Sequence, residues 1–156
     1  MAERPLKGGI VFSELGYAGN VDVQTAFTAL TENTQAVLVD VRTQAEWTFV
    51  GVPDLRTLGK ETIFAEWQSF PPSGPNPAFV QDLSDRLSKK ELDPETPIYF
   101  LCRSGARSQA AAQAMTQAGY TNCYNVSEGF EGGLDAHAHR GTQSGWKAAG
   151  LPWVQG

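Results

Sequence analysis

The stretch YFLCRSGARS, residues 99–108, places one cysteine in a setting that favours nucleophilic chemistry. Cys102 ends an apolar run, and the five residues after it include Arg103, Gly105 and Arg107. A glycine-containing turn that leads into a helix gathers unpaired backbone N–H groups at one point, and two arginines add positive charge there. Such surroundings stabilise a thiolate relative to a thiol. The sequence therefore predicts a thiolate nucleophile at Cys102 inside an anion-binding loop.

The residues of this loop differ in how strongly they indicate an active site. A small buried side chain that merely ends a strand is the other interpretation of Cys102, but two arginines in the next five residues argue against it. Ser108 either caps the helix that follows or also turns its hydroxyl toward the site, and the sequence leaves both open. The candidate loop and substrate-binding positions are Arg103, Ser104, Gly105, Ala106, Arg107 and Ser108.

The second cysteine and the two histidines give weaker signals. Cys123 in NCYNV is too far along the chain to form a C-x-x-C pair and has no flanking cation, so we expect a buried packing residue with an ordinary or raised pKa. His137 and His139 alternate in DAHAHRG, but neither a cysteine nor a patterned set of carboxylates accompanies them. We therefore expect a solvated loop there and predict no metal and no cofactor.

The surrounding segments alternate between helix and strand. Helical periodicity predicts three helices, over residues 21–33, 76–92 and 108–119. Short apolar runs predict three buried strands, over residues 36–41, 98–102 and 122–126. Segment 50–77 is rich in proline and glycine and should be mostly loop with one more short strand. We expect Asp22 to be the N-cap of the first helix and Gly119 to end the third.

This alternation favours one α/β domain over residues 1–156, with a mainly parallel sheet and helices on both faces. Ligands of such folds bind beyond the carboxyl ends of the strands, which is where Cys102 would stand. Arg42 and Glu46 are four residues apart, a spacing that lets them pair on one helical turn. Arg107 would close the loop and form an ion pair with a carboxylate, for which Asp40 and Glu46 are the candidates.

Composition narrows the classes of function. The chain has 156 residues, of which 41% are hydrophobic and 19% charged, values typical of a soluble globular protein without a membrane span. The start MAERPLKGGI lacks the apolar core of a secretory signal, so we expect a cytoplasmic protein. A net charge of -5 disfavours a broad nucleic-acid surface but permits a local anion site.

The chain closely resembles the single-domain rhodanese (thiosulfate sulfurtransferase) family over nearly its whole length. Three stretches carry the resemblance: CRSGARS directly after PIYFL, VDVRTQAEW earlier in the chain, and WKAAGLPW near its end. The resemblance implies the rhodanese-like three-layer fold. In that family a cysteine takes the sulfane sulfur of a donor such as thiosulfate, holds it as a persulfide, and passes it to a thiol or cyanide. The resemblance makes Cys102 the persulfide carrier.

The resemblance also implies roles for the neighbours of Cys102. Backbone N–H groups of residues 103–107 would surround the carried sulfur, and Arg103 would attract an anionic donor. Asp40 and Arg42 match the family's Asp-Val-Arg at a strand end and would support the loop from a neighbouring strand. The expected partners are a small anionic sulfur donor and a thiol or protein acceptor, with no nucleic acid and no membrane.

Two other functions remain open. Cysteine phosphatases and arsenate reductases also use a thiolate in an anion loop that ends in arginine, but their loops place five residues between the two and this chain has four. A smaller ring suits one sulfur atom better than a tetrahedral oxyanion. The other possibility is a non-catalytic domain that senses sulfur or binds partners, although degenerate domains of this type commonly lose the cysteine.

The chain departs from the family pattern in two places. Gly51-Val52-Pro53 stands where relatives often carry Gly-His-Ile. Residues 130–145 form an excursion where relatives need only a few residues before the final Trp-Lys stretch. A long glycine-rich excursion is often functional, and we expect it to cover part of the mouth of the site.

Overall fold

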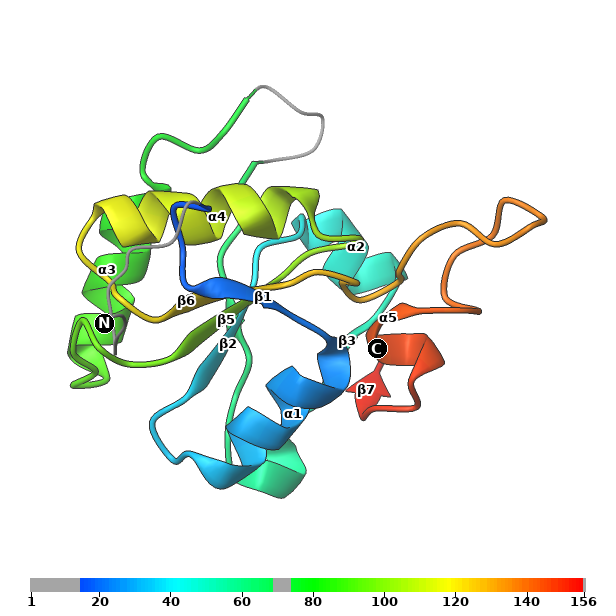
Figure 1. Ribbon diagram of the computed structural model, residues 1–156, viewed down its shortest axis with the longest axis horizontal. Helices are drawn as coiled ribbons and strands as arrows, with labels where there is room; N and C mark the ends of the chain where they lie inside the picture. The colour runs from blue at the N-terminus through cyan, green and yellow to red at the C-terminus, as the bar shows by residue number, and fades with distance from the viewer. Residues whose placement is uncertain (1–14, 69–73, 156) are drawn as a thin grey trace.

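The computed structural model describes residues 15–68 and 74–155 (Figure 1). The expectation about the first ten residues, and residues 69–73 of the expected loop, lie outside this range. Within it, the helices are all too short or too polar to cross a membrane.

A central sheet of five strands runs through the molecule in the order β1-β6-β5-β2-β4, and every pairing in it is parallel. The strands are β1 (Gly19–Val21), β2 (Val37–Asp40), β4 (Ile63–Phe64), β5 (Ile98–Leu101) and β6 (Cys123–Val126). The three buried strands expected from the apolar runs are confirmed as β2, β5 and β6. β5 lies at the centre, between β2 and β6, so the residue after it stands at the middle of the carboxyl edge.

Helices cover both faces of this sheet, as expected (Figure 1). On one face, α3 (Phe79–Lys89) and α4 (Ala106–Gln117) pack through Leu83, Leu87, Ala111 and Met115 against Val39 and Phe100. On the other face, α1 (Val23–Glu32) and α5 (Gly145–Ala148) pack through Leu30 and Trp146 against Leu38 and Leu101. Side chains of a strand alternate between its two faces, so each buried strand contributes side chains to the hydrophobic cores on both sides of the sheet. This is a three-layer α/β fold.

One expectation about helix ends is confirmed and another needs adjustment. Asp22 is the N-cap of α1, since its Oδ1 accepts a hydrogen bond from the Thr25 backbone N–H at 2.7 Å. Helix α4 begins at Ala106 rather than at 108, because Gly105 adopts φ +109° and turns the chain into the helix earlier. Ser108 therefore lies inside the first turn of α4 and is not its N-cap.

Segment 50–77 holds two short strands where one was expected. β4 joins the main sheet, while β3 (Val52–Pro53) pairs antiparallel with β7 (Trp153–Val154), which the sequence did not indicate. A short 3-10 helix, η1 (Arg56–Leu58), lies between them. The remaining helix, α2 (Gln44–Phe49), directly follows β2 and stands beside the carboxyl edge of the sheet.

Candidate active site

Cys102 directly follows β5 at the carboxyl edge of the sheet, and only 1% of the residue is exposed. Its Sγ accepts a hydrogen bond from the Gly105 backbone N–H at 3.1 Å, and the Ser108 Oγ lies 3.2 Å from the same sulfur. Since Gly105 is the N-cap of α4, the sulfur sits at the positive end of this helix. Of the backbone N–H groups of residues 103–107, which were expected to surround the sulfur, that of Gly105 is the one with a described hydrogen bond to it.

Gly105 is required by the tight packing of this loop. Its φ of +109° is rarely adopted by residues with a side chain, and a Cβ built there would overlap the Ser127 carbonyl oxygen. The loop is thus pressed against the chain that leaves β6. Any side chain at this position would push the Gly105 N–H away from the sulfur.

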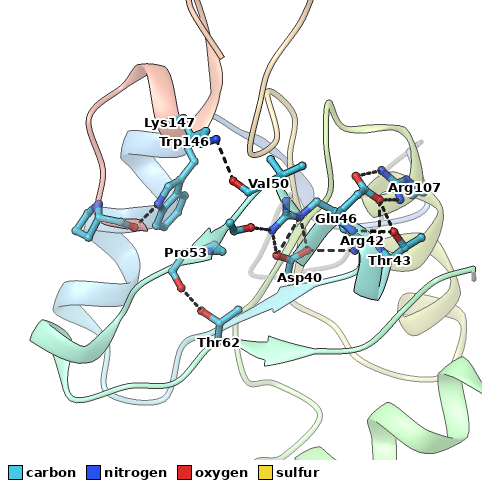
Figure 2. Close-up of polar contacts among 12 residues, drawn as sticks. Asp40, Arg42, Thr43, Glu46, Val50, Pro53, Thr62, Arg107, Trp146 and Lys147 are labelled. Atoms are coloured by element: carbon cyan, nitrogen blue, oxygen red, sulfur yellow. Dashed lines mark hydrogen bonds and ion pairs between the residues drawn. The ribbon is translucent and has the colours of Figure 1, made fainter. Parts of the chain in front are cut away.

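The two loop arginines have different surroundings. Arg103 is exposed and, among the residues that the structure describes, forms no ion pair. Arg107 lies in the first turn of α4 and binds Glu46 of α2 through two hydrogen bonds, Nη1 to Oε1 at 2.6 Å and Nη2 to Oε2 at 3.0 Å (Figure 2). Ser104 is half-buried and Ala106 is exposed. Arg103 is therefore the loop cation that remains available to a ligand.

Glu46 is the carboxylate that holds Arg107, and it is held in turn by its own helix. It forms a capping box with Thr43, whose backbone N–H and hydroxyl both donate to Glu46 Oε1 at 3.1 Å. Burial would raise the pKa of Glu46, but the hydrogen bonds and charge of Arg107 and the bonds from Thr43 outweigh it, so the pKa lies below its ordinary value. The pKa of Arg107 is raised by its bond to Glu46. The pair is thus ionised at neutral pH.

Asp40 and Arg42 form a separate ion pair beside this one, and neither side chain is exposed (Figure 2). Arg42 Nη2 donates to Asp40 Oδ2 at 2.7 Å and to the Gly51 carbonyl at 2.8 Å, and its guanidinium lies 4.3 Å from the centre of the Phe130 ring. The spacing-based pairing of Arg42 with Glu46 is therefore wrong. Arg42 precedes Thr43, the N-cap of α2, so the two residues do not share a helical turn.

The support that Asp40 and Arg42 give to the loop is indirect. Phe130, whose ring contacts Arg42, donates its backbone N–H to the Cys102 carbonyl at 2.8 Å. Glu131 and Gly132 donate theirs to the Arg103 carbonyl, at 3.0 and 3.1 Å. The chain after β6 thus fixes the backbone of the cysteine loop, and the buried ion pair at the end of β2 packs against that chain through Arg42.

Two residues of this site were missed by the sequence analysis. Gly129 has φ +74°, and a Cβ there would overlap the Arg103 carbonyl, so only glycine permits the approach of this segment to the loop. Asn125 of β6 accepts a hydrogen bond from Ser108 Oγ at 2.6 Å, and its amide donates to Asn20 of β1 at 3.0 Å. The sequence does contain a signal for this contact, namely an asparagine inside a predicted buried strand. A buried polar side chain needs a hydrogen-bond partner, so Asn125 indicated a polar contact there.

This chain of hydrogen bonds determines how Ser108 meets Cys102. The Ser108 hydroxyl has one hydrogen, which goes to Asn125 Oδ1, so its oxygen is free to accept the hydrogen of the Cys102 thiol. Ser108 therefore faces the site, one of the two roles that the sequence left open.

Cys123 lies at the start of β6, fully buried, with no described bond to Cys102. Burial raises its pKa to about 12, in agreement with the expected packing role. His137 and His139 are exposed, and the described part of the chain holds no group of three or more His, Cys, Asp or Glu side chains that could bind a metal ion.

We expect Cys123→Ala to retain most of the sulfur transfer that we propose below for Cys102. The protonated Cys123 thiol is a poor nucleophile at neutral pH, and the loss of one buried sulfur should lower the free energy of unfolding by about 1–2 kcal/mol. Transfer rates and urea unfolding of the variant measure both. Loss of transfer in a folded variant, with a Cys102–Cys123 disulfide trapped in the wild type, would show a redox relay instead.

The Arg107–Glu46 pair should contribute about 1–3 kcal/mol to stability at pH 7, because both side chains are only 20% exposed and the contact is bidentate. A carboxylate whose pKa is lowered by folding stabilises the protein above its unfolded pKa, and this contribution is lost as the pH falls through the folded value. The destabilisation caused by Arg107→Ala should therefore shrink between pH 7 and pH 3.

Urea unfolding of wild type, Arg107→Ala, Glu46→Gln and the double variant at several pH values measures this contribution as a double-mutant cycle. A coupling that stays constant down to pH 3 would contradict the role of Glu46.

Comparison with known proteins agrees with this architecture. The crystal structure of Rv0390 from M. tuberculosis is 50% identical and superposes with a TM-score of 0.80, covering 90% of this chain and 99% of that one. The polysulfide-sulfur transferase homodimer from Wolinella succinogenes is 23% identical with a TM-score of 0.54 over 90% of this chain and 80% of its own, a likeness of fold alone.

Sequence relatives include an uncharacterized protein and a rhodanese-like domain protein. The uncharacterized protein RC0915 of Rickettsia conorii is 40% identical over 134 residues, 86% of this chain and 95% of that protein. Rhodanese-like domain-containing protein 4 of Arabidopsis thaliana is 28% identical over 138 residues, 88% of this chain but 26% of that longer protein. The family model of the STR4 middle domain matches residues 18–156.

The three-layer fold and the relatives named as rhodanese-like, at 28% and 30% identity, support the rhodanese-like class at a coarse level. Within that class, the chain belongs to the family of the STR4 middle domain. The rhodanese-like resemblance is thus confirmed, while the family that matches differs from the expected single-domain rhodaneses.

Proposed function

We propose that the protein is a sulfurtransferase that carries a sulfane sulfur on Cys102. The Cys102 thiolate attacks the outer sulfur of thiosulfate or another persulfide donor and a new S–S bond forms. The old S–S bond breaks, and its electron pair leaves on sulfite when the donor is thiosulfate or on the donor's thiolate when it is a persulfide. The outer sulfur then passes to a thiol, to a protein cysteine or to cyanide, and the electron pair of the broken bond returns to Cys102. No external oxidant or reductant is consumed.

The contact between the Gly105 N–H and Cys102 Sγ carries this proposal. One backbone N–H of the loop donates to the sulfur at the positive end of α4, which supports stabilisation of a thiolate or a persulfide anion there. Ser108 Oγ, in the first turn of the helix that Gly105 caps, supplies a second polar contact to the sulfur. The attack of a thiolate on a sulfane sulfur does not itself require a general base.

Intact mass spectrometry after incubation with thiosulfate, and separately with polysulfide, tests the proposal. We expect the mass of the protein to increase by that of one sulfur atom, bound to Cys102. Cyanide added afterwards should remove this sulfur and restore the original mass. A wild-type protein that gains no sulfur from either donor would favour a non-catalytic binding domain. Turnover of an aryl phosphate by the wild type would favour a phosphatase.

Arg103→Ala should raise the KM for thiosulfate about tenfold, because this exposed cation stands beside the nucleophile and would attract a dianion. The fold should be unaffected, since the side chain makes no ion pair with the described residues. Arg56→Ala removes one positive charge from η1, outside the loop, and is the matched control. An unchanged KM in Arg103→Ala, or an equal rise in Arg56→Ala, would contradict a local steering role.

A further inference from the structure

The excursion at residues 130–145 is folded around Asp135. One carboxylate oxygen of Asp135 accepts the backbone N–H groups of His137 and His139, each at 2.9 Å, and the other accepts the Thr142 hydroxyl at 2.6 Å. The Gly141 N–H closes the segment by donating to the Glu131 carbonyl at 2.7 Å. The excursion therefore holds a defined shape and can present side chains to a ligand.

This segment forms one wall of a cleft of about 770 Å³ that opens beside the cysteine loop. Leu134, Ala138 and Arg140 line that wall, Phe49 of α2 lies on the other wall, and Arg103 and Arg107 connect the cleft to the loop. The excursion (orange) projects from the body next to α2 and α5 (Figure 1). The volume lies within the range of small-molecule sites, roughly 300–1,000 Å³.

The cleft carries a positive excess in a chain whose net charge is -5. The charge of Arg107 is balanced by Glu46, which leaves Arg103 and Arg140 against the single carboxylate of Glu131. Arg140 Nη1 donates to the Gly132 carbonyl at 2.7 Å, which fixes the guanidinium at the wall. No other hydrogen bond or ion pair joins Arg140 to the part of the chain that the structure describes. Its other N–H groups remain for an anionic ligand.

Two exposed apolar side chains face the same space. Phe49 is 76% exposed and Leu134 is 52% exposed, and both line the cleft, one from each wall. They would contact a short apolar part of a ligand whose anionic end lies on Arg140. Because Cys102 is only 1% exposed, a group that reaches its sulfur from this cleft has to be slim.

We propose that the cleft binds a low-molecular-weight thiol with a carboxylate, the acceptor of the sulfur on Cys102, and that Arg140 binds this carboxylate. The inference rests on the sulfurtransferase function proposed above. The acceptor thiolate bonds to the outer sulfur of the persulfide while the S–S bond to Cys102 breaks, and its electron pair stays on Cys102 Sγ. The products are a small persulfide and the regenerated Cys102 thiolate. The excursion thereby selects the acceptor.

A matched pair of acceptors tests this selection. Cys102 is first loaded from thiosulfate or polysulfide, and the bound sulfur is verified by intact mass in each variant. The loaded protein is then mixed with mercaptopropionate, which has a carboxylate, or with mercaptopropanol, which is neutral, and the single-turnover rate of sulfur loss is followed against thiol concentration. We expect the wild type to prefer mercaptopropionate about tenfold at low concentration, the effect of one charge-assisted hydrogen bond in a partly solvated site.

Arg140→Gln should abolish that preference, Arg140→Lys should retain most of it, and Arg56→Gln, which lies outside the cleft, should leave it unchanged. The inference is overturned if loaded wild type shows no preference for the carboxylated thiol, or if Arg140→Gln keeps it. Fast transfer to an acidic protein cysteine with no discrimination between the two small thiols would also overturn it and would indicate a protein acceptor. Failure of the wild type to load sulfur from either donor overturns the proposed function, a separately visible result.

Discussion

Cys102→Ser should abolish sulfur transfer while the fold survives. The serine hydroxyl is not ionised near neutral pH and cannot hold a persulfide, so neither half of the reaction can proceed. Its oxygen can still accept the Gly105 N–H and meet Ser108, the two contacts that Cys102 Sγ makes at 3.1 and 3.2 Å. We therefore expect the free energy of unfolding to change by about 1 kcal/mol or less.

The experiment compares persulfide mass, thiosulfate:cyanide transfer and urea unfolding of this variant with those of Cys123→Ala. Cys123 provides the matched control because it is the other free, buried cysteine. Residual transfer in Cys102→Ser, or sulfur bound to another residue, would show that the carrier lies elsewhere in the molecule.

Insertion of one glycine between Gly105 and Ala106 should reduce sulfur transfer by about two orders of magnitude. The Gly105 N–H contacts the sulfur directly, and Ala106 begins α4, so an extra residue between them widens the loop and displaces its N–H groups. A donor would then no longer lie within hydrogen-bond reach of the loop. The wider loop should also bind tetrahedral oxyanions such as phosphate more tightly.

The insertion should leave α4 in place, since Ala111, Ala112 and Met115 keep the helix docked on the sheet. Thiosulfate:cyanide transfer, phosphate affinity and aryl-phosphate hydrolysis are measured side by side on both proteins. A glycine inserted after Thr34, in the exposed turn after α1, controls for insertion itself. Undiminished transfer in the lengthened loop would show that loop size does not determine the chemistry.

Local sequence patterns were sufficient for much of this molecule. The cysteine loop, the buried strands and the packing role of Cys123 depend on residues nearby in the sequence. Apolar periodicity, glycine positions and local charge therefore predict them. β1 was missed because three residues, GNV, carry too little pattern, and its strand conformation comes from pairing with β6. β3 and β7 likewise depend on each other across the chain.

The partners inside the site were decided by the tertiary structure. Sequence left Asp40 and Glu46 as equal candidates for Arg107, and the fold assigns Glu46, because the Asp40 carboxylate is already occupied by Arg42. The Ser108–Asn125 bond and the approach of Gly129 to Arg103 have the same origin, since the sheet order places β6 next to β5 and brings the chain after β6 against the loop. Such contacts join residues far apart in sequence, so they follow from which strands are adjacent, and no local periodicity contains that information.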